Sequence, residues 1–122
     1  MRQRLPMRII LSEAKGTPTH QLGFFALLNL GLVQSLASGV LSPTEAIQCF
    51  YHASNCLYVQ RRLRKREARA IMSRGAQLPD LFDWLPEEEA RREFYHELEA
   101  IRSLCLKLLK KKTSGAVARA AA

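Results

Sequence analysis

Four consecutive residues, Ser42-Pro43-Thr44-Glu45, mark the start of a helix more clearly than any other part of this chain. The Ser42 hydroxyl can accept a hydrogen bond from the backbone of the first turn, and the Glu45 carboxylate can bond back to the capping residue. Pro43 suits the first helical position, whose N–H has no partner within the helix. We therefore predict a helix from Pro43, with these apolar residues on one face: Ala46, Ile47, Phe50 and Tyr51.

Upstream, Thr17-Pro18 predicts an earlier helix start, and Gly39 predicts the end of that helix, just after Ser38. Its apolar residues wrap almost all round it, which is typical of a helix in the centre of a bundle. They are Leu22, Phe24, Phe25, Leu27, Leu28, Leu30, Leu32, Val33 and Leu36. Residues 21–44 contain no charged side chain, but Asn29 and Gln34 interrupt the run. This polarity favours a buried core helix over a membrane-spanning one.

Two further helices are predicted downstream. One runs from about Cys56 to Arg74, after a break or bend at Ser54-Asn55, and Gly75 closes it. A proline-bounded segment, residues 78–86, follows, and we expect its apolar side chains to fold over the bundle: Leu81, Phe82, Trp84 and Leu85. The last helix begins near Pro86 with three glutamates that complement the helix dipole. Its apolar stripe is Ala90, Phe94, Leu98, Ile101, Cys105 and Leu108.

These elements predict an all-α fold, a small four-helix bundle-like single domain. A chain of 122 residues that is 48% apolar and 7% aromatic is sufficient for one core. We divide it into an N-terminal arm (1–16), a helical domain (17–112) and a disordered tail (113–122). Within the arm, residues 7–11 form either a short strand or an irregular lead-in.

The run from Gly31 to Ala46, GLVQSLASGVLSPTEA, resembles a family of small bacterial proteins of unknown function. The later run from Gly75 to Leu81, GAQLPDL, is similar to that family as well. The resemblance covers about residues 22–110 and rests on capping and core residues. It implies a helical fold and brings no catalytic residue with it. The arginine density after Val59 departs from what the family leads us to expect.

The net charge of +8 is distributed in blocks of opposite sign, and the three cysteines form no C-x-x-C pair. Charge blocks are as typical of contacts between helices as of an anionic partner. The odd number of cysteines disfavours a disulfide framework and favours a reducing compartment. We therefore expect a cytoplasmic protein.

The weak candidate for a metal site is Cys49, His52 and Cys56, which share one helical face if the helix continues through Asn55. Thiolate and imidazole groups bind zinc, and His96 or Cys105 could complete the set. Cysteines are more often small buried hydrophobes, however, so we expect no metal. The sequence also has no G-x-S-x-G motif and no glycine-rich phosphate loop. We expect no cofactor and no enzymatic activity.

A basic segment is the strongest candidate for a binding surface. Its cations are Arg61, Arg62, Arg64, Lys65, Arg66 and Arg69, and on one continuous helix they form a broad cationic face. Such a face can follow a phosphate backbone. In the alternative interpretation, this face pairs with an acidic face of the last helix, made of Glu89, Glu93 and Glu97.

We interpret the chain as a small helical protein-interaction module, with an antitoxin- or immunity-like inhibitor as one concrete version. In that version the acidic start of the last helix binds a basic toxin. The alternative is a basic accessory protein that binds nucleic acid through the arginine-rich segment. The partner protein is not identified by the sequence, membrane binding is not expected, and a homo-oligomer stays open.

Overall fold

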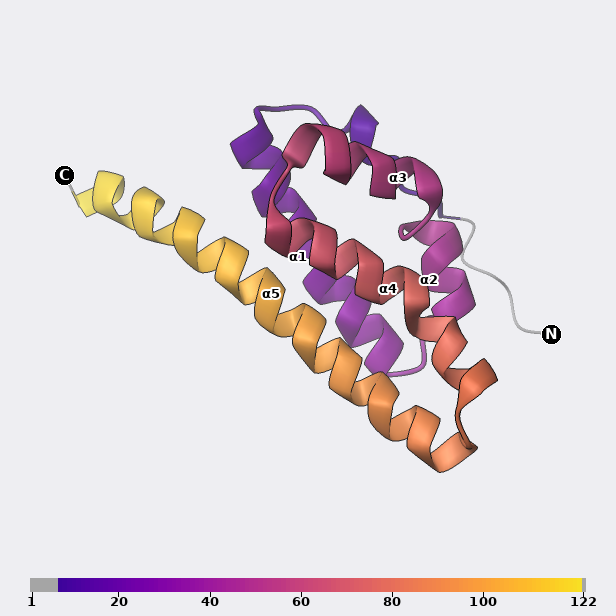
Figure 1. Cartoon of the computed structure of the whole chain (residues 1–122). Coiled ribbons are helices and arrows are strands. Elements are labelled where there is room, and N and C mark those ends of the chain that lie inside the picture. Colours follow the sequence, from indigo (N-terminus) through magenta and orange to yellow (C-terminus); the bar gives the residue numbers. More distant parts are fainter. Residues whose placement is uncertain (1–6, 122) are drawn as a thin grey trace.

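The computed structural model describes the backbone of residues 7–121 and the side chains of residues 7–110. Within this part the fold is all-α, with no strand (Figure 1). The helices are α1 (Pro18–Ala37), α2 (Pro43–Cys49), α3 (Ala53–Tyr58), α4 (Arg66–Trp84) and α5 (Glu87–Ala121). A 3-10 turn at Leu11–Glu13 precedes α1, and a π-helical turn at Val59–Leu63 follows α3. The all-α prediction is therefore confirmed.

The helix boundaries around residues 17–45 are those that the sequence predicts. The Thr17 hydroxyl accepts a hydrogen bond from the His20 N–H at the start of α1. The Glu45 N–H donates to the Ser42 hydroxyl at 3.1 Å, and the Ser42 N–H donates to the Glu45 carboxylate at 2.8 Å. Gly39, which follows α1, has φ of +80°, a conformation that glycine adopts without strain.

The core lies where α5 packs along both α1 and α4 (Figure 1). The predicted stripe of the last helix is buried throughout: Ala90, Phe94, Leu98, Ile101, Cys105 and Leu108. In Figure 1, α5 runs antiparallel to both α1 and α4, and one polar contact links it to each of them. The Tyr95 hydroxyl donates to the Ala37 carbonyl at 3.4 Å, and the Arg74 guanidinium pairs with the Glu97 carboxylate at 2.7 Å.

The predicted single helix from Cys56 to Arg74 is wrong, because the chain breaks at Arg64, and a first break lies before it, between α2 and α3. After α2, the backbone turns at Phe50 and begins α3 behind His52, whose ring accepts a hydrogen bond from the Asn55 N–H. The second break follows the π-helical turn, where Arg64 has φ of 55° in the left-handed region. This left-handed residue turns the chain back on itself, so that α4 begins as a separate helix at Arg66.

Gly75 was expected to close a helix and instead lies in the interior of α4. A Cβ atom at this position would lie 2.5 Å from the Cε1 atom of the buried Tyr51 ring, so glycine allows that ring to pack against the helix backbone. Four residues later, Pro79 is also inside α4, although it has no N–H to donate to the preceding turn. The segment predicted as a proline-bounded cover is thus mostly the last part of α4.

The N-terminal segment is irregular, so the strand alternative at residues 7–11 is wrong. Its backbone forms hydrogen bonds with other elements and not with a neighbouring β-strand: the Ile9 N–H donates to the Cys49 carbonyl at 2.8 Å. The fully buried Asn55 accepts from the Leu11 N–H and donates to the carbonyls of Ile9 and Phe50. Residues 1–6 of the predicted arm lie outside the described part.

At the other end, α5 continues to Ala121, past the end predicted near residue 112. Alanine-rich sequence after residue 115 has high helix propensity, which explains the difference. In the described part of the chain, none of the helices combines the length and the apolar character needed to span a membrane.

Candidate functional site

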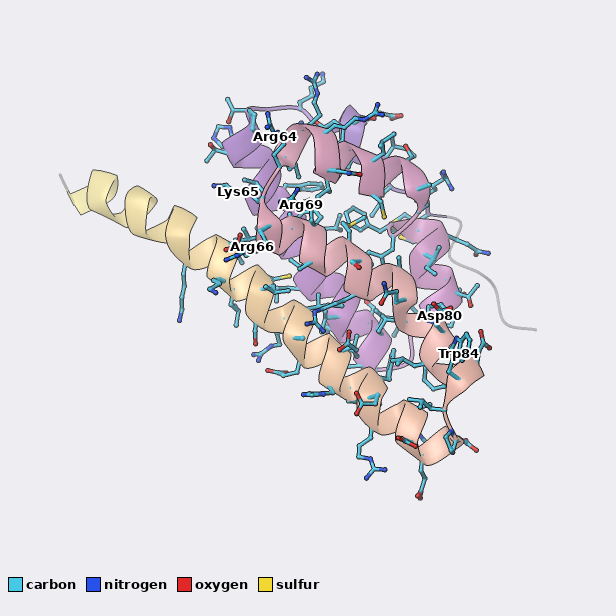
Figure 2. The ribbon with its side chains drawn as sticks, viewed as in Figure 1. Arg64, Lys65, Arg66, Arg69, Asp80 and Trp84 are labelled. Atoms are coloured by element: carbon cyan, nitrogen blue, oxygen red, sulfur yellow. The ribbon has the colours of Figure 1, made fainter. Side chains whose placement is uncertain are left out.

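Two exposed surfaces lie at opposite ends of α4 (Figure 2). We name the first the Trp84 corner, defined by Asp80, Asp83, Trp84, Glu87 and Glu88 at the junction of α4 and α5. We name the second the cationic corner, defined by Arg61, Arg62, Arg64, Lys65, Arg66 and Arg69. At 1.5 Å per residue, Arg66 and Trp84 are separated by about 27 Å along the helix.

Trp84 itself is 82% exposed, so the prediction that it folds over the bundle is wrong. The neighbouring leucines, Leu81 and Leu85, are both partly buried, and Leu81 packs against the hydrophobic core. Phe82 is 45% exposed and contacts the Phe94 ring, with 5.5 Å between the ring centroids. Helical geometry separates these side chains, because consecutive positions point in directions about 100° apart.

The backbone that carries Trp84 is fixed on both sides of the junction. The Leu85 N–H donates to the Leu81 carbonyl at 3.1 Å, and the Ala90 N–H donates to the Pro86 carbonyl at 2.8 Å. The indole is therefore presented from a short, hydrogen-bonded connection rather than from a long loop.

An open pocket of about 280 Å³ lies beside the indole. Its apolar floor includes Leu78 and Leu81, and the Arg74–Glu97 ion pair forms part of its wall. In the alternative interpretation Glu97 pairs with the basic segment, but its partner is Arg74, which is not one of the six cations of that segment. The pocket thus combines an aromatic side chain, apolar surface and a fixed charge pair, which is a composition typical of binding sites.

The acidic side chains around Trp84 are exposed. Glu87 pairs with Arg91 at 3.2 Å within α5, and Glu93 approaches the His96 ring at 3.8 Å. Glu89, the third member of the predicted acidic face, is exposed on the first turn of α5. Glu87, Glu89 and Glu93 lie in the first turns of α5, next to the C-terminal end of α4, whereas the cationic corner lies at the N-terminal end of α4.

The cationic corner is formed by three elements rather than by one helix. Arg61 and Arg62 belong to the π-helical turn, Arg64 and Lys65 form the connection, and Arg66 begins α4. All six cations are exposed. Among the described side chains none of the six forms an ion pair, so the alternative interpretation, in which they pair with the last helix, is not what this part of the structure shows.

The residues of the weak metal-site candidate do not share one helical face, because the break before α3 separates Cys49 from Cys56. The His52 ring is used for structure: Nδ1 accepts from the Asn55 N–H, and Nε2 lies 3.0 Å from the Ile9 carbonyl. Across residues whose side chains are described, no three His, Cys, Asp or Glu side chains are grouped as metal ligands.

Burial also sets the chemistry of the three free thiols. It raises the pKa of Cys49 and of Cys56, and it raises the pKa of Cys105 to about 12. The thiolate, which is the nucleophile and the metal ligand, is therefore disfavoured at all three positions at neutral pH.

The Trp84 corner is the feature that sequence reasoning missed. A signal for it exists: Asp80 and Trp84 are four residues apart. On a helix this spacing places acidic and aromatic side chains on one exposed face. The two prolines at positions 79 and 86 instead led to the prediction of an irregular covering segment.

A family model described as a protein of unknown function (DUF3969) matches residues 19–119 of the chain. Neither the curated proteins nor the solved structures contain a match to the chain.

Proposed function

Since the chain belongs to the DUF3969 family, whose function is unknown, we propose from its structure that it is a docking module for a protein partner. The partner binds at the Trp84 corner, and the module acts by binding rather than by catalysis. We also propose a cytoplasmic location, which the three free thiols support.

The observation that carries this proposal is the exposure of 82% of Trp84 beside an open apolar pocket. Tryptophan is among the residues most enriched in binding hot spots, because it combines a large apolar surface with one N–H donor. In the free protein this surface faces water and gives the fold little stabilisation. A partner that covers the indole and fills the pocket would bury both.

The charge around the indole indicates the chemistry of the partner. Asp80, Asp83, Glu87 and Glu88 give the corner a negative rim, although the whole chain carries a net charge of +8. Complementary charge favours a partner with a basic rim, and a lysine or arginine can also stack on the indole face. An inhibitor of a basic toxin, as in antitoxin- or immunity-type proteins, is the concrete version that we propose.

The test compares Trp84→Ala with a matched control, Phe24→Ala, which removes another exposed aromatic side chain, one that is 48% exposed on α1. Wild-type protein and both variants are immobilised and incubated with nuclease-treated lysate of the source organism. Bound proteins are quantified by mass spectrometry, and binding of each candidate is then measured with purified protein.

We expect a protein that wild type and Phe24→Ala retain and that Trp84→Ala loses, with an affinity at least about 30-fold lower for the tryptophan variant. Glu87→Lys/Glu88→Lys should also weaken binding, chiefly by slowing association. Equal capture by all three proteins would refute the Trp84 corner as the docking surface.

A further inference from the structure

We propose that the cationic corner is a second binding surface, which binds the phosphate backbone of nucleic acid without sequence specificity. This surface is at the end of α4 opposite the Trp84 corner (Figure 2). The two proposals therefore rest on different residues and are tested separately.

The corner holds its cations on a backbone that is fixed by the core. Val59 and Leu63, on either side of Arg61 and Arg62, are buried. The Arg64 N–H donates to the Val59 carbonyl at 2.9 Å, which fixes the connection in its left-handed conformation. Because the backbone is already ordered, binding a polyanion here costs mainly the freedom of the exposed side chains.

Acidic side chains near this surface are too few, among the described residues, to neutralise it. Glu67 is the one acidic residue between residues 59 and 74, and it can offset at most one of the six cations. Glu99 is the last acidic residue of α5. Glu97 already pairs with Arg74 at 2.7 Å, outside the cationic corner. Desolvating these cations against a partner therefore breaks no ion pair.

The register between α4 and α5 adds further positive charge. Arg74 lies beside Glu97, and α4 and α5 are antiparallel. Arg66 precedes Arg74 by as many residues as Cys105 follows Glu97, so Arg66 lies at the level of Cys105. Lys107 and Lys110, which are exposed and follow within two turns, therefore lie at the same end of the bundle as Arg66. The first turn of α4 adds the positive end of a helix dipole.

The types of residue favour phosphate over other anions. Five of the six cations are arginines, whose planar guanidinium groups match phosphate oxygens in a bidentate way. Duplex DNA presents a negative charge about every 1.7 Å, so several of these cations can bind at once. No aromatic residue occurs between residues 59 and 81, so this segment offers no base-stacking group and contacts the backbone alone.

The experiment measures fluorescence anisotropy of a short labelled duplex DNA at several salt concentrations. The variant Arg61→Gln/Arg66→Gln removes one cation from each side of the connection. Arg91→Gln/Arg92→Gln changes the net charge equally but on the exposed surface of the first turns of α5, near the other end of the bundle. The charge-retaining variant Arg61→Lys/Arg66→Lys controls for side-chain packing, and circular dichroism checks that all variants are folded.

For three phosphate contacts, wild-type affinity should fall about 40-fold between about 50 and 200 mM salt, a log–log slope of about −2.7. Arg61→Gln/Arg66→Gln should reduce the magnitude of that slope by about 2, while the lysine variant and the α5 variant keep it. The proposal is overturned by an absence of binding at about 50 mM salt. It is also overturned by equal losses in both glutamine variants, or by binding only to anionic lipid vesicles or to an acidic protein.

Discussion

Replacement of Gly75 by alanine should destabilise this protein, although the same change in an exposed helix stabilises it. Alanine has a higher helix propensity than glycine by about 1 kcal/mol. At Gly75, however, the new Cβ would lie 2.5–2.6 Å from three atoms of the Tyr51 ring. That ring is fully buried, and its hydroxyl donates to Asn29 at 2.7 Å, so it has no free space to move into.

The magnitude follows from these opposing effects. Overpacking of a core costs about 1–3 kcal/mol, and displacement of the ring weakens a buried hydrogen bond worth about 1–3 kcal/mol. After the gain in helix propensity of about 1 kcal/mol, we expect the free energy of unfolding of Gly75→Ala to be lower by about 1–5 kcal/mol. For a chain of 122 residues, this corresponds to a Tm lower by about 4–20 °C.

The assay is urea and thermal unfolding followed by circular dichroism. Gly31→Ala is the matched control, because Gly31 lies within α1 and a Cβ there meets no atom within 4 Å. That variant should be more stable than wild type by about 0.5–1 kcal/mol. In a Tyr51→Leu background the Gly75→Ala penalty should shrink, as a double-mutant cycle will show. A Gly75→Ala variant as stable as wild type would refute the packing argument.

The remaining predictions concern single polar groups. Asn55→Leu leaves the Leu11 N–H and two carbonyls without their partner, and we expect a loss of about 3–5 kcal/mol in urea titrations; a loss below about 1 kcal/mol would contradict it. Ser42→Ala removes one half of the capping box and should cost about 1 kcal/mol by the same assay; Ser103→Ala, at an exposed position inside α5, serves as its control. Burial raises the pKa of Cys105 from 9.0 to about 12, so its stabilising contribution is complete below pH 9 and is lost as the pH rises toward 12. Over that window wild type should lose stability faster than Cys105→Ala, by up to about 1.4 kcal/mol per pH unit, and parallel curves would show that the thiol does not titrate.

Local signals in the sequence were sufficient for the elements that depend on local chemistry. The capping box at Ser42 and Glu45, the start at Thr17 and the stop at Gly39 each involve groups within a few residues of one another. The stripe from Ala90 to Leu108 is likewise a property of one helix, and its burial is confirmed. The all-α class and the core therefore followed from the sequence.

The errors arose where a distant residue decides the local conformation. Gly75 is a helix stop by local rules, but in the fold it lies under a ring that is 24 positions earlier in the chain. The charge pattern of residues 61–69 was interpreted on one helix, because no local feature reveals the left-handed Arg64. The exposure of Trp84 depends on which side of α4 packs against α5. Pro79 and Pro86 predict an irregular segment there, so the sequence does not show that residues up to Trp84 continue α4 or which side of it is buried.

The hydrogen bonds of the N-terminal segment have a consequence for the cooperativity of the fold. The amides of Ile9 and Leu11 are bonded to Cys49 and Asn55, about forty residues away, and neither lies in a regular helix. Amides in an irregular leading segment usually exchange readily with solvent, but these two can exchange only when their contacts with the end of α2 and the start of α3 open. Their protection in hydrogen–deuterium exchange should therefore rise and fall together with that of Asn55, which makes the segment and these two helix ends one cooperative unit.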